Sequence, residues 1–274
     1  MFINFETNKI NKKTAEDFTK NGYIIGDIKN NPNFEILNKK IFEYFRTSLN
    51  IGKNVDQNTL FNNLHKYLNK EKLNQTRVKI IGLMNKNLDI KKNIYLCVKN
   101  FLDEIVGNEL AIQKTLNLSI QFPNDKSSLL DIHADTFSGE SPFQVVVWLP
   151  LVDVYKTKSM FILPIKQSEE AIKKLNDYES KGFEGIYKKY KKYAKYLKID
   201  HGQVLIFSPN LLHGNVINKT PENRISLNIR FKSLFSPYNN VEGNDRKIGY
   251  FYFPLNMKPA SKLGLKFQYP KFKK

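Results

Sequence analysis

The chain has 274 residues, of which 41% are hydrophobic and 13% aromatic, so it can bury a sizeable core and its composition excludes the intrinsically disordered class. The formal net charge of +18 favours an anionic partner, such as a phosphorylated or nucleotide-linked small molecule. The alternative is that part of the charge is compositional, because a bias toward lysine, asparagine and isoleucine is what an AT-rich genome would give. Only five of the 44 basic residues are arginine, and lysine lacks the fork that reads base edges, which disfavours nucleic acid as a partner.

Residues 1–115 are expected to form a mainly helical N-terminal part. The first 13 residues contain no apolar run typical of a secretory signal, and no stretch of the chain is apolar enough to span a membrane, which predicts a cytoplasmic protein. Apolar residues follow the helical period over 33–49, 60–68, 78–84 and 93–106. The single cysteine, Cys97, lies in the last of these segments and is expected to be a core residue in a reducing compartment.

Residues 116–235 have a different texture, in which short β-type runs are separated by proline and glycine. The predicted strands cover 116–122, 129–133, 144–149, 160–163, 204–207 and 225–231. Many short strands favour an antiparallel sandwich or barrel such as a jelly roll, so we predict an α+β protein. We expect a single domain over 1–274, in which the last segment, 236–274, wraps back over the core.

A lysine- and tyrosine-rich insert at 166–200 interrupts the predicted strands. Four of its tyrosines are spaced three apart, which predicts a helical stripe that packs against the sheet with solvated lysines outside. These tyrosines are Tyr187, Tyr190, Tyr193 and Tyr196. The alternative interpretation is a basic lid over a functional site, and such a lid would be a place to look for substrate specificity.

The histidines indicate a metal-binding site. His133 and Asp135 are two residues apart, and side chains at i and i+2 project from the same face of a strand. His213 follows a predicted apolar strand and can supply a third ligand. Two imidazoles and one carboxylate match the facial triad of ferrous oxygenases, which leaves three metal positions open. The triad would be both the catalytic centre and the metal site.

Arg224 lies 11 residues after His213 and begins a predicted strand. A buried arginine at this point could hold the distal carboxylate of 2-oxoglutarate with its two-pronged guanidinium. Ser226 is two residues further along the same face and could donate to the same carboxylate. Gln121, in another predicted strand, either contacts this cosubstrate from the facing sheet or is a polar residue at a sheet edge.

Taken in order, these segments resemble the iron(II)/2-oxoglutarate-dependent dioxygenases. The resemblance rests on HAD at 133–135, WLPL at 148–151 and GQVLIFSPNLLHGNVINKTPENRISLNIRF at 202–231. It is nearest to the phytanoyl-CoA hydroxylase-like branch, which includes oxygenases of bacterial carbohydrate and surface-polysaccharide clusters. It implies a double-stranded β-helix of the cupin type, iron(II) at His133, Asp135 and His213, and 2-oxoglutarate at Arg224 and Ser226. LPIKQS at 163–168 departs from the Pro-Gly-Ser-His segment that the branch often carries, so the resemblance names no substrate.

The expected activity is hydroxylation, with dioxygen, of a small anionic molecule such as a sugar, nucleotide sugar or glycan precursor. Retention of the aspartate favours hydroxylation over halogenation, as the resemblance implies. The alternatives are a non-catalytic jelly-roll module that binds an anionic ligand, and a nucleic-acid demethylase.

The remaining histidines and one arginine have less specific patterns. His201 precedes a predicted strand and is expected to be a turn residue, and His65, in the helical part, is expected at the surface. Arg230 shares a strand face with Arg224, because an even separation of six keeps side chains on one side. It either lines the pocket and meets an anionic substrate or pairs with a carboxylate.

Overall fold

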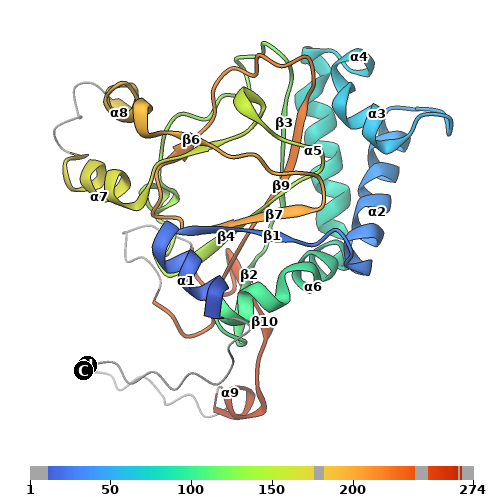
Figure 1. The fold of residues 1–274 in the computed structure, drawn as a ribbon. Helices are drawn as coiled ribbons and strands as arrows, with labels where there is room; N and C mark the ends of the chain where they lie inside the picture. The colour runs from blue at the N-terminus through green and yellow to red at the C-terminus, as the bar shows by residue number, and fades with distance from the viewer. Residues whose placement is uncertain (1–11, 176–181, 238–245, 265, 267–274) are drawn as a thin grey trace.

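The computed structural model describes residues 12–175, 182–237, 246–264 and 266, which form a mixed arrangement of helices and antiparallel sheets (Figure 1). The first part of the described chain is mainly helical. Its helices are α1 (Lys12–Asn21), α2 (Pro32–Ser48), α3 (Gln57–Asn62), α4 (Leu64–Tyr67), α5 (Lys70–Lys86) and α6 (Leu88–Ile105). None of the described helices is both long and apolar enough to span a bilayer.

Asparagine and aspartate side chains set where four of these helices begin. Each accepts a hydrogen bond from a backbone N–H of the first turn, a group that has no partner within the helix. The capping residues are Asn31 for α2, Asp56 for α3, Asn69 for α5 and Asn87 for α6. The asparagine-rich composition therefore contributes directly to the helical boundaries.

A seven-stranded antiparallel sheet is the centre of the fold. Its strand order is β1-β7-β4-β9-β2-β10, and β3 also pairs with β9. The strands are β1 (Tyr23–Asp27), β2 (Leu110–Gln113), β3 (Asn117–Gln121), β4 (Gln144–Pro150), β7 (Gln203–Phe207), β9 (Arg224–Ser233) and β10 (Tyr252–Asn256). β4 is buried along its whole length, as expected of a central strand covered on both faces.

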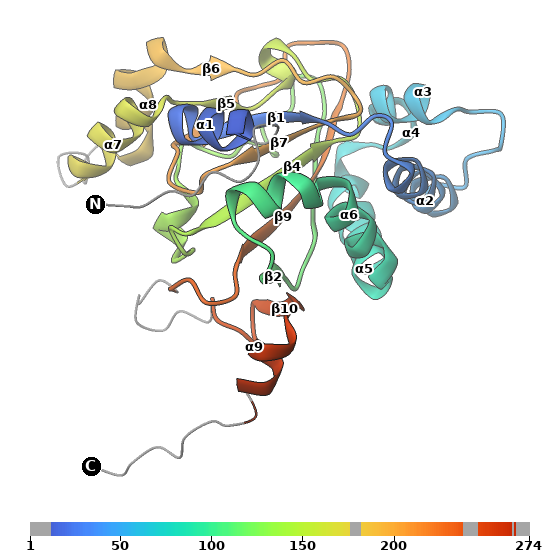
Figure 2. The ribbon, with the colours of Figure 1, turned by 60° about the horizontal axis from the view of Figure 1, so that its bottom comes forward.

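The outer face of this sheet packs against α2, α5 and α6, which lie on one side of it in both views (Figures 1 and 2). The ring of Tyr95 on α6 lies 6.4 Å from that of Phe231 on β9. Gly26 on β1 permits close approach to the same helix, because a Cβ at this position would lie 2.5 Å from the ring of Phe101. This layer contains most of the apolar core.

A smaller three-stranded sheet, in the order β6-β5-β8, faces the other side of the large sheet. Its strands are β5 (Phe161–Ile162), β6 (Lys195–Tyr196) and β8 (His213–Gly214). Its far side has a separate apolar cluster with α7 (Ile165–Lys173) and α8 (Gly182–Tyr190). The last described helix, α9 (Pro259–Gly264), follows β10 and lies at the edge of the molecule (Figure 2).

Strand register determines which polar side chains face the small sheet. Residues directly opposite in an antiparallel pair share a face. Gln121 lies opposite Arg224, and Ser119 lies opposite Ser226. Because side chains alternate along β9, Arg230 belongs to the same face. We call this the inner face of the large sheet, and it is the surface on which the candidate site is built.

Two expectations from the sequence are wrong. Segment 129–133 is not a strand, and only His133 makes an isolated bridge. The mainly helical N-terminal part also contains two short strands, β1 and β2, which are stabilised by pairing with other strands of the large sheet. The tyrosine stripe is broken after Tyr190, because Tyr193 ends a 3₁₀ turn and Tyr196 pairs with β5. Parts of the insert at 166–200 and of segment 236–274 lie outside the described residues.

Candidate metal centre

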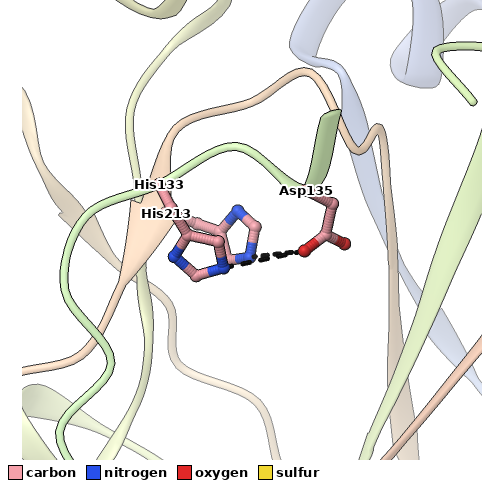
Figure 3. Close-up of side chains that lie close together, drawn as sticks. All are labelled: His133, Asp135 and His213. Atoms are coloured by element: carbon pink, nitrogen blue, oxygen red, sulfur yellow. Dashed lines mark ion pairs between the residues drawn. The ribbon is translucent and has the colours of Figure 1, made fainter. Parts of the chain in front are cut away.

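The two histidines of the predicted triad are held side by side by backbone hydrogen bonds. The N–H of His133 donates to the carbonyl of His213 at 2.9 Å, and the N–H of His213 donates to the carbonyl of His133 at 2.8 Å. Their ring centroids are 4.3 Å apart (Figure 3). A single antiparallel bridge therefore places two imidazoles on the same face, although the residues are far apart in sequence.

Asp135 completes the cluster from a different kind of element than expected. The carboxylate Oδ1 lies 3.6 Å from Nε2 of His133 and 3.9 Å from Nε2 of His213. Asp135 begins a 3₁₀ turn, Asp135–Ser138, which ends at Gly139 with a φ of +82°. The i, i+2 convergence was thus predicted for the wrong local reason, because the chain leaves the extended conformation after Ala134.

Ligand atoms of the three side chains all lie within 4.8 Å of one another, so they could hold one metal ion. Nδ1 of His133 lies 2.7 Å from the carbonyl oxygen of Asp131, and Nδ1 of His213 lies 2.9 Å from that of Leu211. A carbonyl oxygen can only accept, so each Nδ1 carries a proton, and in the neutral ring Nε2 then keeps its lone pair toward Asp135. Both tautomers are therefore set by backbone groups two residues before each histidine.

Electrostatics keep the cluster ready for a cation. Burial lowers the pKa of His213 to about 4, so its imidazole is neutral at pH 7. Burial by itself would raise the pKa of Asp135, but the neighbouring His133 and the positive charge of Arg230 outweigh burial and lower it. Two neutral imidazoles and one carboxylate are the protonation states in which these groups bind a divalent ion.

Arg230 contacts the metal-site carboxylate. Its Nη2 lies 3.0 Å from Oδ2 of Asp135, the oxygen that faces away from the histidines. Of the two roles left open by the sequence, the structure therefore contains the pairing with a carboxylate. The pattern of residue types gave no sign of which carboxylate that would be.

Arg224 is buried on the inner face with no acidic partner among the described residues. The residue is 4% exposed, and among the described residues its only side-chain hydrogen bond runs from Nη2 to Oγ of Ser119 at 3.2 Å. Its Nε has no hydrogen-bond partner within the described part of the chain. Burial lowers the pKa of Arg224 to about 10. An uncompensated guanidinium in this setting could bind an anion.

The predicted neighbours of Arg224 lie beside it with polar atoms to spare. Within the described residues, Oγ of Ser226 and Oε1 of Gln121 are buried and have no hydrogen-bond partner. Nε2 of Gln121 donates to the carbonyl of Val216 at 2.7 Å, so Gln121 ties the inner face to the chain that follows β8. Sequence reasoning missed Ser119, because only the β3–β9 register reveals that it faces Ser226.

The other candidates lie outside the cluster. The ring of His201, just before β7, packs 5.2 Å from that of Phe34. His65 is half-buried rather than exposed, because its Nδ1 lies 2.9 Å from Oδ1 of Asn223. Cys97 is buried on α6, and burial raises the pKa of its thiol to about 12, as a core residue requires.

Comparison with known proteins gives a fold and one distant relative. No family model matches the chain. The streptomycin biosynthesis protein StrG of Streptomyces griseus is 25% identical over 175 residues, which cover 62% of this chain and 69% of StrG.

Solved structures match over more of the chain. The non-heme monooxygenase ThoJ in its apo form has a TM-score of 0.55 at 14% identity, covering 89% of this chain and 84% of ThoJ. EctD from S. alaskensis, solved with 2-oxoglutarate and 5-hydroxyectoine, has a TM-score of 0.51 at 15% identity, covering 90% and 85%. The chain therefore shares its fold with the non-heme monooxygenase ThoJ and with EctD.

Proposed function

We propose that this chain is an iron(II)- and 2-oxoglutarate-dependent oxygenase. The observation that carries the proposal is the buried Arg224, which has no acidic partner among the described residues and shares a sheet face with Arg230, the arginine that contacts the His, Asp, His cluster. The first feature fits an anionic cosubstrate and the second fits a metal ion that would chelate it. Arg224 by itself disfavours the folded state, because its guanidinium is buried with no acidic partner among the described residues.

The donor set fits iron(II). His133, Asp135 and His213 would hold the ion through two neutral imidazole nitrogens and one carboxylate oxygen, which is the facial arrangement that leaves room for a cosubstrate and dioxygen. When bound, iron and 2-oxoglutarate supply the oxidising chemistry, and the protein supplies orientation and exclusion of water. The backbone carbonyls of Asp131 and Leu211 hold the imidazoles in the tautomer that this role needs.

Arg224, Ser226 and Gln121 have different parts in the proposed cosubstrate site. The guanidinium of Arg224 would pair with the distal carboxylate of 2-oxoglutarate, and the free hydroxyl of Ser226 would donate to it. Gln121 uses one amide N–H on the carbonyl of Val216, which leaves its second N–H and its acceptor oxygen available. It lies opposite Arg224 and would either orient the guanidinium or donate to the carboxylate.

The reaction we favour is hydroxylation, by a dioxygenase of the phytanoyl-CoA hydroxylase-like branch, of a small anionic metabolite such as a sugar, nucleotide sugar or glycan precursor. ThoJ is a non-heme monooxygenase, and EctD has been solved with iron and with 2-oxoglutarate, which supports an oxygenase. StrG is named for streptomycin biosynthesis, which supports a small-molecule substrate. The net charge of +18 supports an anionic one.

The architecture proposed with this function is a double-stranded β-helix. The large and small sheets would be its two halves, with the cluster of His133, Asp135 and His213 between them. In this proposal 1–115 is a helical N-terminal part, 116–235 the jelly-roll core with its insert, 236–274 a C-terminal extension, and all belong to one oxygenase domain.

The test is an anaerobic titration of metal-free protein with iron(II) and then 2-oxoglutarate, which follows the weak visible charge-transfer band of the chelate. We expect a band in the wild type that is lost in His213→Ala and in Arg224→Ala. His65→Ala is the matched control, because His65 lies outside the cluster, and it should retain the band. Iron binding without a band would refute the cosubstrate site. Failure to bind iron at all would leave an anion-binding module as the better function.

A further inference from the structure

Arg230 is anchored at several points on the inner face. Its side chain is 12% exposed, and its Nη2 forms the ion pair with Oδ2 of Asp135. Oε1 of Gln113 accepts from both the backbone N–H and Nη1 of Arg230, at 3.2 Å each. Its Nε lies 3.7 Å from Oε1 of Glu140. Oxygens of Asp135, Gln113 and Glu140 therefore lie on three sides of the guanidinium, and that of Gln113 accepts a hydrogen bond from it.

The two oxygens of the Asp135 carboxylate face different partners. Oδ1 is the oxygen within 3.9 Å of both imidazole Nε2 atoms, whereas Oδ2 faces Arg230. The terminal torsion of an aspartate has broad minima, so an unrestrained carboxylate could turn and offer both oxygens to a metal. The ion pair with Arg230 opposes that rotation, because turning would separate Oδ2 from the guanidinium.

A buried carboxylate connects this arginine to the C-terminal part of the chain. Glu140 is 2% exposed, and its Oε1 also lies 3.3 Å from Nε of Arg246. The hydroxyl of Tyr252, on β10, donates to Oε2 of Glu140 at 3.1 Å. Tyr252 is fully buried. Glu140, which lies near Arg230, is therefore also held in place by Arg246 and Tyr252 of the C-terminal segment.

We propose that Arg230 is a positioning residue that restrains Asp135 to bind the metal through Oδ1 alone, and that Gln113 and Glu140 hold Arg230 in place for this purpose. Single-oxygen binding would keep a coordination position open for the cosubstrate or dioxygen. The identity of the metal rests on the proposed function, but the geometric role of Arg230 holds for any divalent ion in the cluster.

Cobalt(II) is a suitable probe, because its visible absorption reports the number and arrangement of its ligands. The informative variant is Arg230→Lys, which keeps the positive charge and removes the planar fork, so any change reflects geometry. The matched control is Arg46→Lys. Arg46 forms an ion pair with Glu43 at 2.7 Å on α2, outside the cluster. A second variant, Gln113→Met, removes an anchor of Arg230 without touching a metal ligand.

We expect Arg230→Lys to weaken cobalt affinity by about 10- to 100-fold and to change the visible spectrum. Gln113→Met should shift the spectrum in the same direction by less, and Arg46→Lys should match the wild type. Wild-type affinity and spectrum in Arg230→Lys would overturn the inference. Normal metal binding with lower turnover alone would also overturn it, by making Arg230 a substrate contact.

The wild-type titration separates this inference from the proposed function. If wild-type protein binds no divalent metal, the proposed function fails before any variant is compared. If the wild type binds cobalt and the variants do not differ from it, only the role of Arg230 fails. If Gln113→Met alone is unchanged, the anchoring by Gln113 fails, and the spectrum of Arg230→Lys decides the role of the arginine.

Discussion

Replacing Arg224 with methionine should stabilise the ligand-free protein and abolish 2-oxoglutarate binding. Burial lowers the pKa of Arg224 from 12.5 to about 10, which means that the fold disfavours the charged guanidinium. At pH 7 the side chain is charged in both the folded and the unfolded state, so this difference is a cost to folding. At about 1.4 kcal/mol per pKa unit, the cost is about 3 kcal/mol.

The methionine side chain is unbranched and uncharged and can occupy much of the space of the arginine side chain. Replacing an isolated buried charge with an apolar side chain commonly increases stability. We therefore expect the free energy of unfolding of the ligand-free protein to rise by about 1–3 kcal/mol. In the presence of iron(II), 2-oxoglutarate at 100 times its dissociation constant should stabilise the wild type by about 2.7 kcal/mol and the variant by nothing.

Urea unfolding with and without iron(II) and 2-oxoglutarate measures both effects in one set of samples. Arg46→Met is the control, since the Arg46 side chain is 20% exposed and its loss should change stability by less than about 0.5 kcal/mol. If Arg224→Met destabilises the ligand-free protein, Arg224 is a structural residue and its burial does not cost stability. If 2-oxoglutarate still stabilises the variant, Arg224 is not needed to bind 2-oxoglutarate.

Three further predictions concern the fold. Gly26→Ala should destabilise the protein by about 1–3 kcal/mol in urea unfolding, because the new Cβ would lie 2.5 Å from the ring of Phe101. Gly82→Ala in α5 is the control, because its new Cβ meets nothing within 4 Å and should stabilise the protein by up to about 1 kcal/mol. Equal effects of the two substitutions would contradict this packing. Burial raises the pKa of Cys97 from 9.0 to about 12, so native protein at pH 8 should react with iodoacetamide roughly 1000-fold more slowly than protein in urea, which mass spectrometry would detect. Raising the pH above 9 should favour unfolding, because only the unfolded thiol ionises there. Asp56→Ala removes the cap of α3 and should cost about 1 kcal/mol; an unchanged urea midpoint would argue against the cap.

The secondary structure that sequence patterns predict correctly has strong local signals. The helical period over 33–49 and 93–106 corresponds to α2 and α6, and the apolar run at 144–149 corresponds to β4. β1 was missed because YIIGD is five residues long and becomes a strand only by pairing with β7. The segment at 129–133 was predicted as a strand because its apolar residues imitate one, but only His133 finds a partner.

The sequence by itself determined which residues form the candidate site. With four histidines in the chain, the order His133, Asp135, His213 and then Arg224 leaves few other ways to combine a candidate metal centre with an arginine that could bind an anion. The side-chain types by themselves indicate the ligands, because imidazole and carboxylate bind divalent metal and guanidinium binds carboxylate. That information is local to each side chain and does not depend on how the chain is folded.

The tertiary structure alone decided how those residues are held. The pairing of Arg230 with Asp135, the carbonyl partners of the two imidazoles, and the place of Ser119 beside Arg224 all join residues that are distant in sequence or turned by an irregular segment. Each depends on strand register or on the 3₁₀ turn at Asp135, where a shift of one residue would move the side chain to another face. Such contacts arise from the free energy of the whole packed chain, which no short pattern contains.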